Sequence, residues 1–285
     1  MSNNNRKRRA NMAQETLDIL EAGTYINNQK ETIDIQETQQ NAIALTNLYA
    51  PENFEDEVFS KSNQILTSLD FTTEFEVTSE TTLQAAKRLI DQGEENVAVL
   101  NFASAKNPGG GFLGGSQAQE ESLARSSGLY PCLEKHKPLY LANRKRRTGL
   151  YSDHMIYSPQ VPVFRDDDGS LLDTPYPISI ITSPAVNAGS VKDNYPEEAD
   201  QVEATMLGRT EKVLSLAVAY QHDVLVLGAW GCGVFKNNPK DIARYFASFL
   251  LADGQFAKAF KKVIFAVYSS QKNNPNMVAF EEFFG

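Results

Sequence analysis

Residues 107–130 read NPGGGFLGGSQAQEESLARSSGLY, and they follow the apolar run VAVLNF at 97–102. A continuous apolar run of this length is typical of a strand that is covered on both faces. The glycines at 109–111, 114 and 115 leave the next segment almost without side chains. Strand, glycine loop and helix in this order indicate an α/β protein. The loop could bind a ligand closely through its backbone, as phosphate-binding loops do.

The start of the expected helix carries two adjacent carboxylates. Ser116 to Gln119 have the form of a capping box, with serine as the N-cap and glutamine three residues later. This places Glu120 and Glu121 in the first turn and a half, where the helix dipole alone favours acidic residues. Neighbouring helical residues point about 100° apart, so the pair is not expected to flank one bond as paired glycosidase carboxylates do. With the glycine loop beside them, we expect one to orient a substrate and the other to transfer protons.

The rest of the chain alternates strands and helices. This pattern predicts one α/β sandwich with a largely parallel sheet and an N-terminal helical extension. Helices are expected at 11–22, 81–92, 196–220 and 238–250, strands at 71–78, 178–181, 224–227 and 263–267, strands around a polar turn at 24–50, and a turn-rich excursion at 164–175.

Composition excludes several classes of protein. The 285 residues carry a net charge of −9, which argues against broad binding of duplex nucleic acid. No apolar run is long enough to span a membrane, and the basic N-terminus precedes no apolar stretch, so we expect neither a membrane partner nor a secretory signal. Two cysteines and three scattered histidines form no disulfide or metal pattern. We therefore expect a cytoplasmic protein without a bound metal.

Two basic runs, both RKRR, depart from the acidic average. Residues 6–9 are interpreted as a solvated terminus. For residues 144–147, which follow the helix with the glutamates, two interpretations stay open: a solvated loop, or a guard at the mouth of an anionic site. A tightly bound anion is expected to be held by backbone amides in either case.

A second glycine loop follows the strand at 224–227. The sequence VLVLGAWGCGVFKNNP at 224–239 is no Walker A loop, because Lys236 is followed by asparagine. Backbone amides in such a loop can still form an anion-binding nest. Phe235 either packs on a sugar or base of the ligand or faces the core. Trp230 and Cys232 are expected to line the wall of the ligand site. Together the two loops indicate a diphosphate ligand with a sugar beside the glutamates.

A dinucleotide-binding site is a weaker alternative. Gly109, Gly111 and Gly114 fit the GxGxxG fingerprint, which also expects an acidic residue after a second strand about 20 residues on. Residues 131–147 contain Glu134 but no strand pattern. A nicotinamide-dependent oxidoreductase is therefore a remote possibility.

The glutamate region resembles a known family. GGG at 109–111, seven residues and then QEE at 119–121 resemble the GGG-x(6–8)-QEE signature of poly(ADP-ribose) glycohydrolases. The stretches LNFASAKNPGGG, QAQEESLARSSGLY, SPQVPVFRDDDG, ITSPAVN and LGAWGCGVF are similar to the microbial branch. The resemblance implies a macrodomain, a three-layer α/β/α sandwich with a mixed, largely parallel sheet. We therefore expect a single domain over 1–285. Residues 1–90 would form the N-terminal extension and the first strands, and residues 91–285 would form the catalytic core.

The resemblance also implies an activity. The enzyme would reverse ADP-ribosylation by hydrolysing ribose–ribose O-glycosidic bonds of poly(ADP-ribose), exo-acting, without metal or cofactor, and its partners would be the polymer and ADP-ribosylated proteins. Glu121 would be the general acid and Glu120 would hold ribose hydroxyls. The substrate-binding residues would be Asn107, Gly109, Gly110, Gly111, Gln119, Asn187, Gly231, Cys232, Gly233, Val234 and Phe235.

Two other functions stay open at this point. A reader module would bind ADP-ribose without cleaving it, but such a module does not need the two glutamates. A hydrolase of mono-ADP-ribosylated protein is barely distinguished from a polymer hydrolase. Tyr268 is either part of an adenine pocket or a packed core tyrosine.

Overall fold

A computed structural model describes residues 3–269 and 274–285. Its short turns are a π-helical segment, Phe54–Val58, and two 3₁₀ segments, Phe112–Gly114 and Pro196–Glu198. The helices and strands are α1 (Asn3–Ala22), β1 (Thr24–Ile26), β2 (Thr32–Asp34), α2 (Gln36–Leu45), β3 (Asn47–Tyr49), α3 (Pro51–Asn53), α4 (Phe59–Leu66), β4 (Glu74–Thr78), α5 (Thr82–Asp91), β5 (Val97–Phe102), α6 (Gln119–Ser126), α7 (Leu129–Glu134), α8 (Lys137–Lys145), β6 (Met155–Arg165), β7 (Leu171–Ser183), α9 (Ala188–Asn194), α10 (Gln201–Ala219), β8 (Val224–Leu227), α11 (Pro239–Leu250), β9 (Lys262–Ala266) and α12 (Pro275–Phe284).

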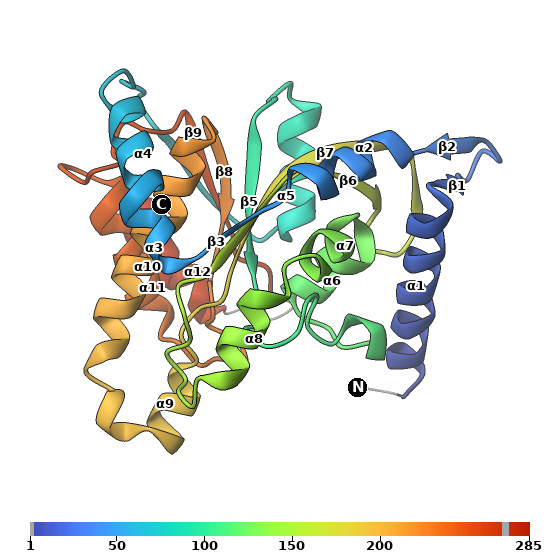
Figure 1. Cartoon of the computed structure of the whole chain (residues 1–285). Coiled ribbons are helices and arrows are strands. Elements are labelled where there is room, and N and C mark those ends of the chain that lie inside the picture. The colour runs from blue at the N-terminus through green and yellow to red at the C-terminus, as the bar shows by residue number, and fades with distance from the viewer. Residues whose placement is uncertain (1–2, 270–273) are drawn as a thin grey trace.

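The central sheet has seven strands in the order β3-β6-β7-β5-β8-β9-β4 (Figure 1). The pairs β7–β5, β5–β8, β8–β9 and β9–β4 are parallel, whereas β3–β6 and β6–β7 are antiparallel. The prediction of a largely parallel sheet is confirmed. Because parallel strands end at the same edge, the loops after β5, β7, β8 and β9 converge there.

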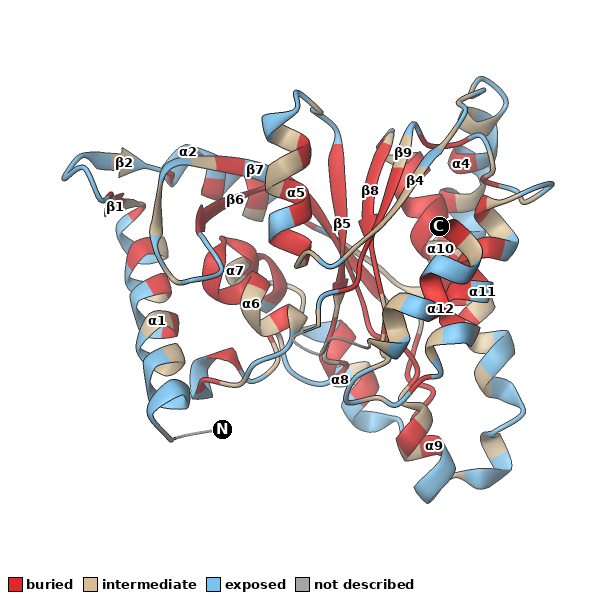
Figure 2. Cartoon of the chain, turned by 180° about the vertical axis from the view of Figure 1, so that it is seen from behind, coloured by how far each residue is buried: buried red, intermediate tan, exposed pale blue. Residues whose placement is uncertain are grey.

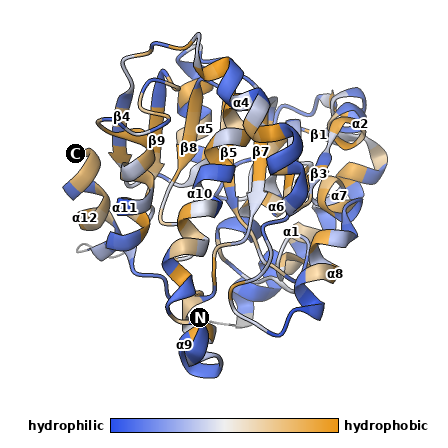
Figure 3. Cartoon of the chain, turned by 60° about the vertical axis from the view of Figure 1, so that its left-hand side comes forward, coloured by the Kyte–Doolittle hydropathy of each residue, from blue (hydrophilic) through white to orange (hydrophobic). Residues whose placement is uncertain are grey.

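Helices cover both faces of the sheet, which makes the three-layer architecture that was expected. On β5, Val97 and Val99 pack in a core with α5, α6, α7 and α8, while Ala98 and Leu100 pack in a second core with α10, α11 and α12. Figure 2 shows the central strands as buried, and Figure 3 shows them as largely hydrophobic. The apolar run at 97–102 is thus a strand buried on both faces. No helix in the described ranges is long and apolar enough to cross a membrane.

The N-terminal region differs from the prediction in two respects. The first helix begins at Asn3 and not at residue 11, and it ends before Gly23, whose φ of +70° suits a glycine. Within 24–50, where strands were expected, residues 36–45 form α2. The side chains of Gln39 and Ala42 are buried there. Tertiary packing therefore decides the conformation of a segment whose local pattern is weak.

The excursion expected at 164–175 is a hairpin. Strand β6 runs to Arg165 and β7 starts at Leu171, so only the five residues between them form the turn. The antiparallel register of β6 shifts between Ser158 and Val161, and Gln160 there has a φ of +50°. Pro159 and Pro162 lie at this irregularity and interrupt the apolar run that would have marked β6 as a strand buried on both faces.

Candidate active site

The start of α6 is joined to the end of β5 by the side chain of Gln119. Its Oε1 accepts a hydrogen bond from Phe102 N at 2.8 Å, and its Nε2 donates to Leu100 O at 2.8 Å. The helix begins at Gln119 with Ala118 at the N-cap and no side-chain cap, so the capping box predicted at Ser116 is wrong. Gln119 bonds to the strand because the loop leaves β5 and returns beside it. The two glutamates are thereby held at the carboxyl edge of the sheet.

Glu120 is buried, with 3% of its surface exposed. Its Oε2 accepts a hydrogen bond from Ser104 N at 2.7 Å, and its Oε1 accepts one from Asn101 Nδ2 at 3.3 Å. Burial raises the pKa of Glu120 to about 8, and the neighbouring Glu121 adds to this; hydrogen bonds from Ser104, Asn101 and Gly109 act in the opposite direction. At neutral pH the Glu120 carboxyl is therefore mostly protonated.

Glu121 is partly exposed and faces the glycine loop. Its Oε1 accepts a hydrogen bond from Gly111 N at 3.0 Å, and within the described residues its Oε2 accepts none. At Gly110, where φ is +61°, a Cβ atom would lie 2.4 Å from Glu121 Oε1 and 3.2 Å from Glu120 Oε2. The loop therefore lies directly against both carboxylates, and only glycine fits at its centre.

The outer side of this loop is held by α1. Arg6 Nε donates to Gly114 O at 2.9 Å, and Arg9 Nε donates to Gly115 O at 2.8 Å. A Cβ on Gly115 would come within 2.1 Å of Arg6 O. Residues 6–9 were interpreted as a solvated terminus; Arg6 is indeed exposed and Arg9 partly so, but both are ordered by their bonds to the glycine loop. Their partners are more than 100 residues away in sequence, so no local pattern could have indicated the contact.

The second glycine loop, residues 228–238, is fixed by a buried side chain. Asn237 Nδ2 donates to Val186 O at 2.7 Å and to Gly231 O at 3.1 Å. Within the described part of the chain, the backbone N–H groups of Gly233, Val234 and Phe235 have no hydrogen-bond acceptor. They are therefore available to an anion, as an anion-binding nest requires.

The side chains of this second loop take different positions. The Phe235 ring is partly buried, with its centroid 5.8 Å from that of Tyr151, and the side chain of Val234 is 81% exposed. Cys232 is partly buried, and burial raises the pKa of its thiol to about 12. The prediction that Trp230 lines the wall of the ligand site is wrong. This residue is fully buried, and its indole N–H donates to Ser183 O at 3.0 Å.

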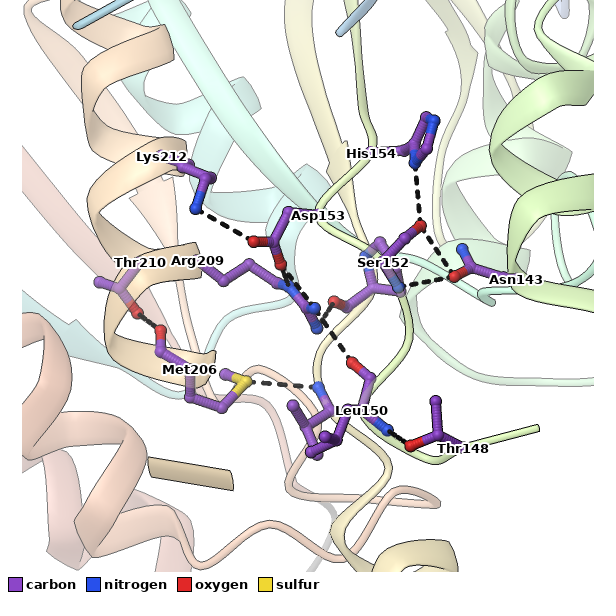
Figure 4. Close-up of polar contacts among 12 residues, drawn as sticks. Asn143, Thr148, Leu150, Ser152, Asp153, His154, Met206, Arg209, Thr210 and Lys212 are labelled. Atoms are coloured by element: carbon purple, nitrogen blue, oxygen red, sulfur yellow. Dashed lines mark hydrogen bonds and ion pairs between the residues drawn. The ribbon is translucent and has the colours of Figure 1, made fainter. Parts of the chain in front are cut away.

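A third loop, residues 184–187, follows β7 and is held by Arg209 of α10, whose contacts with Asp153 and Leu150 are drawn in Figure 4. The buried guanidinium donates to Pro184 O at 3.0 Å and to Leu150 O at 3.0 Å, and it pairs with Asp153 at 2.7 Å. This arrangement fixes Asn187, whose Oδ1 accepts from Ser190 N at 2.9 Å as the N-cap of α9. The amide Nδ2 of Asn187 lies 3.4 Å from the Tyr151 hydroxyl, next to the Phe235 ring.

Asn107 lies on the exposed side of the first loop, where it meets the second basic run. Its Oδ1 accepts a hydrogen bond from Arg144 Nη2 at 3.1 Å. All four side chains of residues 144–147 are exposed, as a solvated loop would be, and the Arg144 bond places the run beside Asn107, so both interpretations stay open. Arg144 was not among the predicted substrate-binding residues, although the charge run had marked its segment; the structure places it beside Asn107.

A cavity of about 440 Å³ lies beside the start of α6. Its lining includes Phe102, Gln119, Ala229 and Tyr268. Tyr268 is 62% exposed, which excludes the alternative of a packed core tyrosine. Among residues 3–269 and 274–285, no group of three or more His, Cys, Asp or Glu side chains is arranged to hold a metal.

A protein-family profile described as "Microbial-type PARG, catalytic domain" matches residues 13–166, which include both glutamates and the first glycine loop. PARG is poly(ADP-ribose) glycohydrolase. The chain belongs to the microbial-type PARG family. A search of the curated proteins gave no match.

Solved PARG structures are similar over nearly the whole chain. The PARG of Thermomonospora curvata bound to the inhibitor ADP-HPD is 44% identical, and the match covers 97% of this chain and 99% of that one with a TM-score of 0.88. The PARG of Deinococcus radiodurans in complex with ADP-ribose is 46% identical, covering 86% of this chain and 95% of that one with a TM-score of 0.79. The macrodomain-like fold expected from the sequence is thereby confirmed.

Proposed function

We propose that this chain is a poly(ADP-ribose) glycohydrolase that hydrolyses ribose–ribose O-glycosidic bonds and releases ADP-ribose. One observation carries the proposal: a partly exposed glutamate, Glu121, is hydrogen-bonded to a glycine loop that has no room for side chains. The relatives that bind ADP-ribose or ADP-HPD and are glycohydrolases by name support it. A nicotinamide-dependent oxidoreductase has no support in this family.

Glu121 is assigned the proton transfers. Its Oε2 has no hydrogen-bond partner within the described residues, so it can face the leaving ribose oxygen. The residue would protonate that oxygen as the oxocarbenium-like transition state forms and then take a proton from water. Glu120 is the less suitable acid because it is buried and both its oxygens are occupied. Its protonated carboxyl would instead orient ribose hydroxyls.

The remaining substrate contacts are assigned by loop. Gly109 to Gly111 would approach the scissile ribose, with Asn107 and Asn187 at its hydroxyls. The loop from Gly231 to Phe235 would hold the diphosphate through the free amides of Gly233, Val234 and Phe235, and the Phe235 ring would pack on the substrate. Gln119 lines the cavity with Tyr268, and this cavity has the size and the apolar wall to take the adenosine part.

Further parts of the proposal concern the whole protein. The chain would act as one catalytic domain over 1–285 in the cytoplasm, with ADP-ribosylated proteins as partners and without duplex nucleic acid or a membrane. It would be exo-acting and independent of metal. Undiminished activity in EDTA would agree with metal independence, and activity restored only by added metal would contradict it.

The test is the release of ADP-ribose from poly(ADP-ribose) by wild type and by Glu121→Gln, with ADP-ribose affinity measured for both. We expect the variant to lose on the order of 10²–10⁴-fold in kcat while affinity is kept, because only the proton transfer is removed. Glu37→Gln is a matched control, since Glu37 is an exposed glutamate in the first turn of α2. A wild type that binds ADP-ribose but releases none from chains would indicate a reader. Release only from singly modified protein would indicate a mono-ADP-ribosyl hydrolase.

A further inference from the structure

Four consecutive cations lie at the end of α8 and just beyond it. We call Arg144, Lys145, Arg146 and Arg147 the basic rim. All four side chains are exposed, and none forms an ion pair with a carboxylate in the described ranges. In a chain with a net charge of −9, such a concentration of unpaired positive charge needs an explanation.

The basic rim lies between two loops of the site. On one side Arg144 contacts Asn107, whose backbone O accepts from Gly110 N at 3.0 Å, and Gly110 lies against Glu121. On the other side the segment continues to Gly149, whose carbonyl accepts from Asn187 N at 2.8 Å. Figures 1 and 2 show α8 and α9 at the same end of the molecule. The rim therefore lies beside Asn107, on the exposed side of the first loop, which we take as the entrance to the carboxylates.

The stability of helix α8 does not account for all four cations of the basic rim. Arg144 and Lys145 are in the last turn of α8, where cations favour the helix dipole, but Arg146 is the C-cap and Arg147 lies beyond the helix. Arg146 also adds like-charge repulsion to the burial that lowers the pKa of Arg209. Thr148 donates to Glu198, which places one carboxylate near the segment but not in an ion pair with it. Two of the four cations thus have no structural role in the helix.

We propose that the basic rim binds the diphosphate of the polymer unit on the leaving side of the scissile bond. This inference rests on the proposed function. If Glu121 protonates the leaving ribose oxygen, the unit that departs must extend from the carboxylate toward the entrance, where the rim lies. Guanidinium groups bind phosphate oxygens through paired, charge-assisted hydrogen bonds. The released ADP-ribose unit is held by the two glycine loops, so the rim serves only substrates that carry a further unit.

The rim therefore selects chains over single units. Poly(ADP-ribose) carries a diphosphate in every repeat, whereas a protein with a single ADP-ribose has none on its leaving side. The affinity for chains should depend on the rim and on salt concentration, and the affinity for ADP-ribose should not.

The deciding variant is Arg146→Gln/Arg147→Gln, which leaves the Arg144 contact with Asn107 in place. Its control is Lys30→Gln/Lys61→Gln, which removes two exposed cations, one in the turn between β1 and β2 and one in α4, that like the rim form no ion pair with a carboxylate in the described ranges. We expect the first variant to raise KM for long chains about tenfold at low salt, with kcat nearly unchanged. Each tenfold change corresponds to about 1.4 kcal/mol, a reasonable value for two phosphate contacts. The control variant should match the wild type.

Binding is measured separately in the Glu121→Gln background, with purified chains and with ADP-ribose as the two probes. The rim variant should weaken chain binding, reduce its salt dependence and leave ADP-ribose binding unchanged. Equal effects in rim and control variants, or an equal loss of affinity for both probes, would overturn the inference. A wild type that releases nothing would contradict the proposed function, while the binding measurements would still decide the role of the rim.

Discussion

Glu120 and Glu121 are neighbours in sequence with very different surroundings. Glu120 is buried against Ser104 and Asn101, whereas Glu121 is partly exposed beside Gly111. The motif and the helix start predict the pair and a division of roles between its members. The sequence could not predict which one is buried, because that depends on Gln119 holding the start of α6 to β5.

The raised pKa of Glu120 predicts a pH dependence of stability. The folded protein keeps this proton up to a pH of about 8, whereas an unfolded chain releases it near pH 4.3. The stabilisation is therefore fully present below the unfolded pKa and is lost as the pH rises through 8. Between pH 7 and 8.5, the unfolding free energy of wild type should fall by about 1 kcal/mol more than that of Glu120→Gln, as measured by urea unfolding.

The histidines do not interfere in this pH window. Burial lowers the pKa values of His136, His154 and His222. Their contribution to the unfolding free energy therefore varies with pH only below the ordinary histidine pKa. Parallel pH profiles for wild type and Glu120→Gln would contradict the prediction and indicate that Glu120 is already ionised at pH 7.

At the scale of elements, the glycine loop makes a sharper prediction than the helices do. An alanine at Gly110 would have to adopt a φ of +61° with its Cβ 2.4 Å from Glu121 Oε1, so the carboxylate or the loop must move. A displacement of about 1 Å at a reacting group can cost on the order of 10²-fold in rate. Gly110→Ala should therefore lower kcat on poly(ADP-ribose) by about that factor.

Gly93→Ala is the matched control. Gly93 has a φ of +88°, so an alanine carries similar backbone strain, but a Cβ there would meet no atom within 4 Å. Both variants should lose stability to a similar extent in thermal unfolding, and only Gly110→Ala should lose its rate. An equal loss of rate in both would mean that backbone strain, and not contact with Glu121, is the cause.

Elements with strong periodicity were predictable from sequence, and those set by packing were not. The apolar runs of β5, β8 and β9 and the amphipathic helix α5 lie where they were expected. Helix α2 was mistaken for strands because its position depends on burial of Gln39 and Ala42. Strand β6 was missed because Pro159 and Pro162 interrupt its apolar run at the shift in register.

At the scale of the whole molecule, the layers follow from composition and pattern, but the contacts between distant segments do not. The parallel strands had to gather their loops at one edge, so the two glycine loops could be expected to meet. Arg209 was not singled out, because its partners Leu150, Asp153 and Pro184 come from other parts of the chain. Such a residue is recognised only once the fold is known.

Arg209 accordingly carries the prediction for the whole molecule. Arg209→Met keeps the length and apolar stem of the side chain. Within the described residues, it leaves Asp153 with Lys212 as its remaining ion-pair partner, and it deprives the carbonyls of Leu150 and Pro184 of their donor. Loss of one partner of a fully buried ion pair costs about 3–5 kcal/mol. Because Asp153 is 26% exposed and keeps its pair with Lys212, we expect a loss near the lower end of this range, roughly 3 kcal/mol, and a clear fall in the midpoint of urea unfolding. Arg244→Met is the control, because the pair of Arg244 with Glu203 is exposed and should contribute about 1 kcal/mol or less.

Since Pro184 begins the loop that carries Asn187, Arg209→Met should also weaken ADP-ribose binding under conditions where the variant is fully folded. Unchanged affinity in such a folded variant would mean that Asn187 is positioned by its own bonds to Gly149 and Ser190 and not by the contacts of Arg209.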